Sequence, residues 1–457
     1  MDFVDFVERH VATIEPLEKE SALAYWEAAR TGNEEDFRRY SELIIELEKV
    51  YTNKDDFEFI SESRNDGALR DEKLKRIADL LYLQYLANQI DHELLSRIVE
   101  LSSSVENRFN VFRPEVDGRK ITTNDVNDAL RNERDSEVRR KVWEADKRVA
   151  LGIVDDLVRL VELRNEAAKG VGFDNFYSMS LTVSEQDETE MVKLFDELDE
   201  LTREPYEELK ARIDAELASI YGIEAEDVMP WHYHDPFLQE APNIGKVDID
   251  KFYEKSDVVE VAVDFYNGIG MDVTDIIARS DLYEREGKSP HAFCTNIDRH
   301  GDVRILANIR NNSTWMDTIL HELGHAVYDK NIDCDLPYIL RTYPHLCTTE
   351  ASAMYFGRLA QDPLWMKSAL HLNDYEIEAA GPAIRDRMRT RQMIFARWCQ
   401  TMFRFERELY RDPRQDLNKL WWDIVEKYQL VRRPEGRNEP DWAAKIHIVT
   451  SPVYYHN

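Results

Sequence analysis

The pentapeptide His321-Glu322-Leu323-Gly324-His325 is the feature that most constrains this chain. On a helix, residues four apart share a face, so both imidazoles can reach one metal ion. Glu322 is one step round the helix and stands beside the open coordination position of that ion. The alternative is a chance match on an ordinary amphipathic helix. We interpret the pattern as a zinc site in which Glu322 serves as the base.

The residues around the pentapeptide have helical apolar spacing. The apolar positions recur at three- and four-residue steps: Trp315, Ile319, Leu320, Leu323, Ala326 and Val327. Ser313 or Thr314 can cap the start of this helix, and Asp317 falls in the expected first turn, where negative charge is favoured. We therefore expect a rigid helix that presents both histidines on one face.

A catalytic zinc ion usually has three protein ligands and a fourth position for water, so one ligand must come from elsewhere. Glu350 is the preferred candidate, 25 residues after His325 in a helical segment that follows Pro337 and Pro344. Two antiparallel helices can bring such ligands together. His345 is a competing ligand, but it directly follows Pro344 and belongs to the expected connection. The alternative for Glu350 is a helix-start carboxylate stabilised by the helix dipole.

This motif, the 25-residue step and several flanking segments resemble the helical zinc peptidases grouped around angiotensin-converting enzyme and thimet-type oligopeptidases. Residues 161–168, with the turn at residues 172–177, resemble a long helix and turn in the first half of those enzymes. A weaker similarity lies in residues 17–20 and 24–28. The specific part of the resemblance runs from about residue 289 to residue 354.

The resemblance implies a mainly α-helical fold: a two-lobed metallopeptidase with a deep central channel and the zinc on its floor. Composition allows this fold, because 457 residues exceed what one core normally holds. No internal repeat or flexible linker is present, so we expect residues 1–457 to form one unit whose two lobes interleave along the chain. Helices are expected over residues 205–220 and 382–410, each opening with a proline in its first turn.

One short β-hairpin is expected next to the zinc helix. Residues 291–297 and 303–309 are β-rich and flank a turn that contains Gly301. An exposed strand edge beside a zinc site can hold an extended peptide by main-chain hydrogen bonds. In the resembled family a corresponding strand does this, which places His291 and Ala292 at substrate-contacting positions. The alternative is a hairpin that only closes a lobe.

The C-terminal segment carries further groups that the resemblance assigns to the site. His447 resembles the family's substrate-binding histidine. Lys445 resembles a lysine that captures the terminal carboxylate of the substrate in the converting-enzyme branch. Alternatively, Lys445 is only a solvated surface charge, and we give this interpretation the same weight as carboxylate capture.

The tyrosines that follow depart from the family pattern, in which two tyrosines lie three residues apart and one donates to the oxyanion. Here Tyr454 and Tyr455 are adjacent and the sequence stops at Asn457. If this segment is aligned with the family pattern without a gap, Tyr454 matches the first tyrosine and Asn457 takes the place of the second, catalytic tyrosine. With a one-residue insertion, Tyr455 becomes the first. Either tyrosine is a candidate donor, both can simply pack, and a truncated C-terminal end is one interpretation.

A second histidine cluster, His232 and His234 beside Asp235, lies between Pro230 and Pro236. Residues two apart converge only on a strand or a suitable loop. Because the prolines mark a loop, we interpret the cluster as channel lining or lobe packing and not as a second metal site.

The formal net charge of −31 argues against a duplex nucleic acid partner, whose phosphates need a basic footprint. The sequence has no signal-peptide pattern and no run approaching the roughly 18 apolar residues of a membrane span. Its four cysteines are sparse and form no disulfide framework. We therefore expect a cytoplasmic location with no membrane partner. The oligomeric state, the organism and its salt habitat stay open.

Together these features predict zinc-dependent hydrolysis of peptide bonds in short peptides, with one Zn²⁺ ion held by His321, His325 and Glu350. The ion is expected to polarise the scissile carbonyl and to lower the pKa of water to about 7. Glu322 then takes the proton of the water and passes it to the leaving amine. His447 and a tyrosine are expected to stabilise the oxyanion.

Two finer alternatives stay open. The enzyme is either a general oligopeptidase, which we slightly favour, or a peptidyl-dipeptidase, depending on how Lys445 faces the channel. A protein of another class is also possible on this sequence: a catalytically impaired helical peptide-binding protein that retains zinc and lacks the oxyanion tyrosine. An aminopeptidase is disfavoured, because no Gly-x-Met-Glu-Asn-type motif for a free amino terminus is present.

Overall fold

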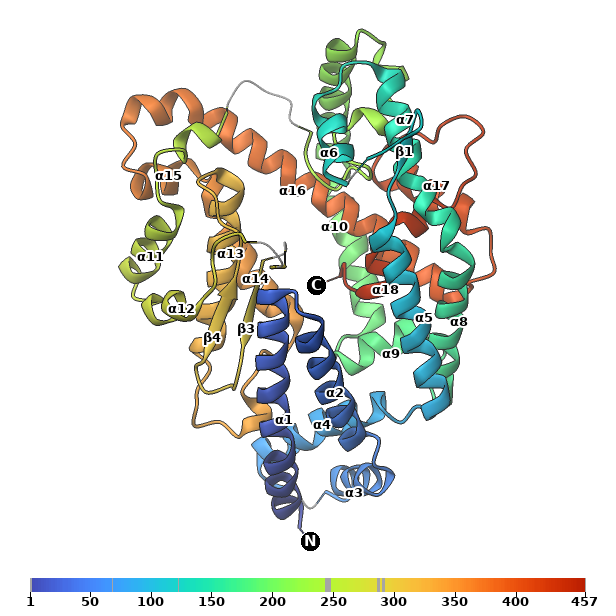
Figure 1. The fold of residues 1–457 in the computed structure, drawn as a ribbon, viewed down its shortest axis with the longest axis vertical. Helices are drawn as coiled ribbons and strands as arrows, with labels where there is room; N and C mark the ends of the chain where they lie inside the picture. The colour runs from blue at the N-terminus through green and yellow to red at the C-terminus, as the bar shows by residue number, and fades with distance from the viewer. Residues whose placement is uncertain are drawn as a thin grey trace. The chain divides into compact units, whose positions relative to one another are not determined.

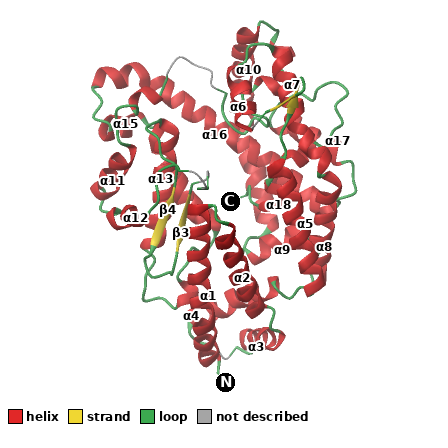
Figure 2. Cartoon of the chain, in the orientation of Figure 1, coloured by secondary structure: helices red, strands yellow, loops and turns green. Residues whose placement is uncertain are grey.

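The computed structural model describes residues 2–67, 69–121, 123–242, 248–285, 288–289 and 292–456. Over these residues the chain is mostly helical, with two short antiparallel strand pairs (Figures 1 and 2). The mainly α-helical fold expected from the sequence is therefore confirmed. Within the described ranges, every helix is too short or too polar to cross a membrane.

The chain divides into two compact units, each assembled from separate stretches of sequence. Unit 1 contains the described residues of Met1–Gln89 and Val247–Arg385. Unit 2 contains those of Ile90–Lys246 and Asp386–His456.

Unit 1 places the zinc motif helix in the middle of an apolar core. Its elements are α1 (Phe3–Thr31), α2 (Glu34–Tyr51), α3 (Lys54–Asn65), α4 (Glu72–Ala87), α11 (Val258–Gly268), α12 (Thr274–Arg279), β3 (Phe293–Asn296), β4 (Val303–Leu306), α13 (Ser313–Lys330), α14 (Leu346–Gly357), α15 (Pro363–Ala369) and the first part of α16 (Asp374–Arg411). On α13, Ile319, Leu320 and Leu323 are fully buried against Val303 and Ile305 of β4 and their neighbours. The opposite side of α13 is therefore free to carry polar side chains.

Unit 2 has a core rich in aromatic side chains, including Trp398, Phe405, Trp421 and Trp442. Its elements are α5 (His92–Val111), β1 (Glu115–Val116), β2 (Arg119–Lys120), α6 (Thr123–Asn132), α7 (Ser136–Lys147), α8 (Val154–Gly170), α9 (Phe176–Val183), α10 (Glu188–Tyr221), the rest of α16, α17 (Leu417–Tyr428) and α18 (His447–Thr450). Short 3₁₀ turns in the two units span Arg148–Gly152, Ala225–Asp227, Pro230–His232, Asp250–Phe252, Tyr338–Leu340, Arg358–Gln361 and Asp441–Ala444.

Pro205 and Pro382 do not open helices as predicted, since they lie inside α10 and α16. A proline inside a helix removes one backbone hydrogen bond and costs about 3 kcal/mol. The helix α10 nevertheless continues, because it buries Phe195 before the proline and Tyr206 and Leu209 after it in one core. Packing of both halves outweighs the local cost.

The β-hairpin next to the zinc helix is confirmed. Strand β3 pairs antiparallel with β4, with Cys294 opposite Ile305, and both strands pack against α13. The strands are shorter than the predicted runs, because the backbone N–H groups of Ala307 and Ile309 donate instead to Asp281 and Leu282. A second pair, β1 with β2 in unit 2, was not expected. Its strands of two residues are too short to show alternation.

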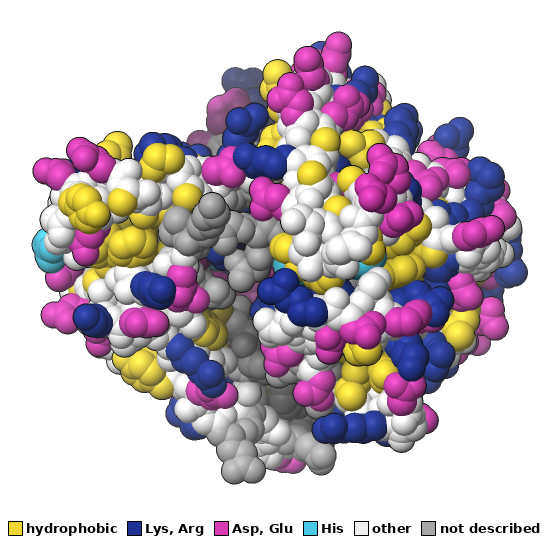
Figure 3. Space-filling view, turned by 90° about the horizontal axis from the view of Figure 1, so that it is seen from above, with side chains coloured by type: hydrophobic (Ala, Val, Ile, Leu, Met, Phe, Trp, Pro, Cys, Tyr) yellow, Lys and Arg dark blue, Asp and Glu magenta, His cyan; other side chains and the backbone are white. Residues whose placement is uncertain are grey.

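The surplus of acidic side chains is spread among basic ones on the visible surface (Figure 3). Many of them form local ion pairs on helices, such as Glu35 and Glu42 with Arg38. Exposed pairs of this kind add little to stability, because water and salt screen the two charges. The surface charge therefore bears on solubility more than on the stability of the fold.

Candidate metal centre

The N-cap of the zinc motif helix α13 lies one residue before the first of the two predicted caps. The side chain of Asn312 accepts a hydrogen bond from the backbone N–H of Trp315 at 2.9 Å, so Asn312 is the cap. Ser313 is the first helical residue and Thr314 the second, and neither is the cap. Asp317 consequently lies beyond the first turn and not within it. The helix still places His321 and His325 on one face, as its periodicity requires.

The helix α14 carries Glu350 in its second turn. The helix begins at Leu346, and His345 is its N-cap residue, without a side-chain capping bond. Glu350 is thus not a helix-start carboxylate, which removes the alternative role that the sequence left open. The connection between α13 and α14 holds Pro337 and Pro344, as expected.

Small residues allow α13 and α14 to pack closely along the ligand face. Gly357, the last residue of α14, sits against α13, where a Cβ would lie 3.2 Å from the Cβ of His321 and 2.9 Å from Oδ1 of Asp317. Gly324, inside the motif, faces Ala353 of α14 in the same way. Close approach of the two helices brings the side chain of Glu350 within reach of the histidines.

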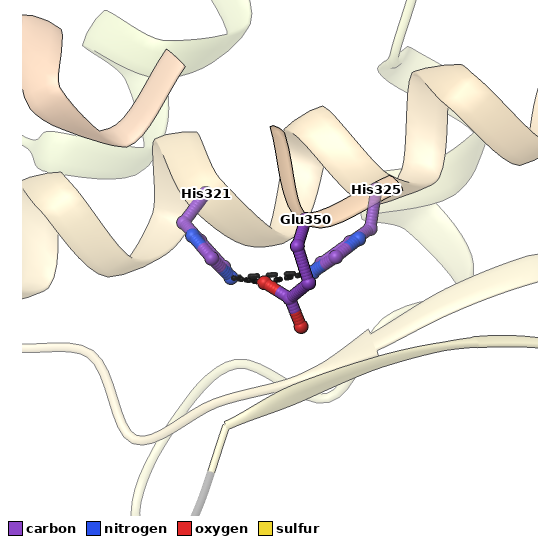
Figure 4. A group of neighbouring side chains, drawn as sticks. All are labelled: His321, His325 and Glu350. Atoms are coloured by element: carbon purple, nitrogen blue, oxygen red, sulfur yellow. Dashed lines mark hydrogen bonds and ion pairs between the residues drawn. The ribbon is translucent and has the colours of Figure 1, made fainter. Parts of the chain in front are cut away.

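Three potential ligand atoms converge between the two helices (Figure 4). The Nε2 atoms of His321 and His325 are 3.2 Å apart, and each lies 3.7 Å from Oε2 of Glu350. A tetrahedral zinc ion with bonds of about 2.0–2.1 Å separates its ligand atoms by roughly 3.3 Å. The observed spacing fits zinc. Among the described residues, no other trio of His, Cys, Asp or Glu side chains comes this close. The competing ligand His345 lies outside the trio.

Thr349 fixes the orientation of one of the two imidazoles. Its Oγ1 lies 2.7 Å from Nδ1 of His325. If Nδ1–H donates to this hydroxyl, Nε2 keeps its lone pair for a metal. Burial and the neighbouring His321 lower the pKa of His325 to about 4, so the ring is neutral at pH 7. Sequence reasoning missed Thr349, although it directly precedes Glu350.

Glu322 is a buried carboxyl beside the ligand trio, with 7% of its surface exposed. Burial, and then the charge of Glu350, raise its pKa to about 8, while a hydrogen bond from the backbone N–H of Cys294 opposes the rise. A carboxyl with a pKa near neutral pH can both accept and return a proton. The arrangement therefore suits the base predicted from the motif.

Strand β3 lies beside this carboxyl, because the backbone N–H of Cys294 is close enough to Glu322 to lower its pKa. Ala292, just before β3, is partly buried against the core of unit 1. His291 lies outside the described residues. The hairpin therefore lies next to the candidate base.

Lys445 belongs to unit 2, and it is not a solvated surface charge, since only 7% of its surface is exposed. Its Nζ donates to Oε1 of Gln239 at 2.5 Å. Burial lowers the pKa of Lys445 to about 8, and Asp235 and Glu240 oppose this shift. The side chain lines a cavity of about 240 Å³ together with Gln239. Sequence reasoning missed Gln239, because 206 residues separate it from Lys445.

His447, Tyr454 and Tyr455 form one aromatic group in unit 2. The His447 ring lies 6.1 Å from that of Tyr454 and 5.4 Å from that of Tyr455. Tyr455 is buried and packs edge-on against Trp398 at 5.6 Å, while Tyr454 is partly exposed. Tyr454 therefore has the more accessible side chain of the two candidate donors. Asn457 lies outside the described residues.

The sequence profile of the angiotensin-converting enzyme family, a family of peptidases, matches residues 2–456. The chain belongs to the angiotensin-converting enzyme family. One relative is the inactive angiotensin-converting enzyme-related protein of Caenorhabditis elegans, which is 20% identical over 369 residues. The match covers 72% of this chain and 40% of that protein, so the chain spans well under half of the relative's length.

The family match narrows the resemblance drawn from the sequence. It supports the converting-enzyme group, and it gives no specific support to the thimet-type oligopeptidases. A peptidase family that acts on peptides through zinc agrees with the trio of His321, His325 and Glu350.

The second histidine cluster of this family member consists of packed loop residues. Nε2 of His232 lies 2.7 Å from Oγ of Ser136, and Nε2 of His234 lies 3.0 Å from the hydroxyl of Tyr221. Burial lowers the pKa of both histidines to about 4. Their ring nitrogens are thus engaged with hydroxyl groups inside unit 2, in agreement with a packing role.

Proposed function

We propose that this member of the converting-enzyme family is a zinc peptidase that hydrolyses short peptides. The observation that carries the proposal is the convergence of His321, His325 and Glu350 at spacings of 3.2 and 3.7 Å beside the buried Glu322. Two helices supply these groups, and close helix packing sets their positions. Family membership supports the same chemistry.

Zinc at this trio supplies Lewis acidity, which polarises a scissile carbonyl and acidifies water. Glu322 accepts the proton of the attacking water and returns it to the leaving amine. Its raised pKa suits both transfers, because the protonated and ionised forms lie close in free energy at neutral pH. Thr349 keeps His325 in the orientation and tautomer that a metal ligand needs.

The substrate backbone is proposed to extend along the edge of β3 that does not pair with β4, with Ala292 among its contacts. Main-chain hydrogen bonds of this kind hold a peptide without regard to its side chains. The proximity of the Cys294 N–H to Glu322 supports the placement, since the strand and the base are neighbours.

Lys445 and Gln239 are proposed to receive the C-terminal carboxylate of the substrate, and His447 with Tyr454 or Tyr455 to stabilise the oxyanion. The burial of the Lys445 ammonium and its place on a cavity wall support carboxylate capture. This favours release of C-terminal dipeptides over general oligopeptide cleavage.

The decisive experiment measures zinc content and hydrolysis of short fluorogenic peptides together. We expect one zinc ion per wild-type chain, and we expect Glu322→Gln to retain it while hydrolysis falls roughly 10²- to 10⁴-fold. The matched control is Glu260→Gln, at an acidic residue on α11 of the same unit, and we expect it to retain activity. Full activity in a zinc-loaded Glu322→Gln variant refutes the proposal.

A second candidate function is favoured by the name of the relative, which is an inactive member of the family. In that case this chain binds zinc and peptides without cleaving them. Calorimetric binding of peptides by the zinc-loaded wild type, with no cleavage product detected by mass spectrometry, would establish the binding function in place of the enzyme.

A further inference from the structure

The segment of residues 447–455 carries His447 and both candidate tyrosines, yet it has little regular structure of its own. It contains α18, a helix of four residues that ends at Thr450. A single helical turn is not stable by itself, because its few hydrogen bonds do not offset the loss of conformational entropy. Contacts from other elements must therefore set its position.

Arg164 of α8 holds the backbone of this segment. The guanidinium donates to the carbonyl oxygens of Ile448 at 3.0 Å and Val449 at 2.6 Å, and to the hydroxyl of Tyr410 at 3.1 Å. Only 6% of Arg164 is exposed. Carbonyl groups at the end of a short helix have no partner within it, so a planar cationic fork is well matched to them.

Glu406 of α16 holds the same segment four to five residues further on. Its Oε1 accepts the backbone N–H of Val453 at 3.0 Å, and only 2% of Glu406 is exposed. Val453 has a φ of +59°, a left-handed conformation that a β-branched residue rarely adopts. Such a conformation persists when the surroundings hold it, and the bond to Glu406 is one such constraint.

The two charged groups belong to one buried arrangement. Burial raises the pKa of Glu406 to about 7, and the bond from Val453 and the charge of Arg164 oppose this rise. Asn165 joins α8 to α16, since its Nδ2 donates to the carbonyl of Tyr410 at 2.8 Å. Two helices and the C-terminal segment are thus tied together by polar bonds inside an apolar core.

Burial alone does not explain this choice of residues, because apolar side chains would fill the same space without the cost of desolvating two charges. Arg164 and Glu406 are distinguished by the partners of their hydrogen bonds. Arg164 binds two carbonyls and Glu406 binds one N–H of the same short segment, so together they fix its backbone at both ends.

We propose that Arg164 and Glu406 are positioning residues, a buried clamp that sets the orientation of residues 447–455 and thereby places His447 and Tyr454 for the substrate. The catalytic consequence rests on the proposed peptidase function. The effect on the orientation of residues 447–455 does not depend on that function. The clamp lies wholly in unit 2, whereas the zinc ligands lie in unit 1. Disturbing it should therefore impair peptide turnover and leave zinc binding intact.

The test uses the full chain with Arg164→Lys, which keeps the charge and loses the fork. Arg159→Lys on the same helix is the matched control, since Arg159 is exposed and paired with Glu162 at 3.1 Å. Glu406→Gln is a second variant that keeps the size of the side chain. Hydrogen exchange of the amides of residues 447–455, zinc content, kcat and KM are measured for each.

We expect Arg164→Lys to speed exchange in residues 447–455 and to lower kcat/KM roughly 10- to 100-fold, mainly through kcat. Zinc content and exchange in α13 should match the wild type, and Arg159→Lys should behave as the wild type in every measurement. Glu406→Gln should change exchange at Val453 in the same direction. Unchanged exchange in residues 447–455 overturns the clamp, and so does faster exchange throughout the chain with loss of zinc.

These results separate the clamp from the proposed function. If the zinc-loaded wild type cleaves no peptide, the proposed function fails, and faster exchange confined to residues 447–455 in Arg164→Lys still supports the clamp. If the wild type cleaves peptides and Arg164→Lys cleaves them equally well, the clamp has no positioning role and the proposed function stands.

Discussion

Gly324 of α13 lies directly against Ala353 of α14, so that a Cβ on Gly324 would be only 2.7 Å from the Cα of Ala353. A backbone atom cannot move aside as the end of a flexible side chain can. The glycine within the metal motif therefore has a packing reason. It lets α14 approach closely enough for Glu350 to reach the two histidines.

Replacing Gly324 with alanine should push α14 away and weaken zinc binding. We expect a loss of roughly 1–3 kcal/mol in the free energy of unfolding, as for other overpacked sites, and at least about tenfold weaker zinc affinity. Competition with a chromogenic chelator measures the affinity. Gly268→Ala, at the end of α11, is the control because its added Cβ meets open space. Equal zinc affinity in Gly324→Ala and the wild type would contradict this account.

Thr349→Val should weaken zinc binding roughly 10- to 100-fold, because the hydrogen bond that orients His325 is lost while the shape of the side chain is kept. Thr349→Ser keeps a hydroxyl and should bind zinc nearly as the wild type does. Chelator competition again provides the measurement. If valine and serine bind zinc equally well, the hydroxyl of Thr349 has no part in the metal centre.

Lys445→Met should raise KM for peptides with a free C-terminal carboxylate by about tenfold or more, since a charge-assisted hydrogen bond is removed. The same peptides with a C-terminal amide should show no such change. Steady-state kinetics on matched acid and amide peptides decide the matter. Lys141→Met, at an exposed lysine paired with Asp117, serves as control. An equal rise in KM for acid and amide peptides argues against carboxylate capture.

Glu406 should make the folded state less stable as pH rises through the acid range. Its pKa is raised from 4.5 in the ordinary state to about 7 in the fold, so the native protein binds the proton more tightly than the unfolded chain does. This contribution is complete below about pH 4.5 and is lost as pH rises to about 7, by on the order of 1–3 kcal/mol. Urea unfolding of the wild type and Glu406→Gln between these pH values measures the difference. A difference that stays constant with pH would show that the carboxyl has no raised pKa.

The helical part of the site was predictable because it depends on local periodicity. A four-residue step puts His321 and His325 on one face in any helix, and apolar spacing indicates which face is buried. The details of the helix start were less predictable. Asn312, Ser313 and Thr314 are all competent caps, and the choice among them depends on which backbone conformation the preceding loop delivers.

The prolines show how tertiary packing overrides a local signal. Pro205 and Pro382 are each compatible with a helix start, and sequence reasoning placed helix starts there. In the fold each lies within a longer helix. The free energy that decides between the two outcomes comes from core residues on both sides of the proline, and no local window contains that information.

By itself, the sequence determined the pair of imidazoles, the adjacent Glu322 and the hairpin beside them, because each follows from spacing within one element or a short turn. The mainly helical class followed from the family resemblance that the sequence carries. Only the tertiary structure decided that Thr349 orients His325 and that Lys445 is buried. It also decided that Arg164 and Glu406 both bind the backbone of residues 447–455. In those last two cases the interacting groups lie far apart along the chain, and their contacts arise from how helices pack, which spacing in the sequence does not encode.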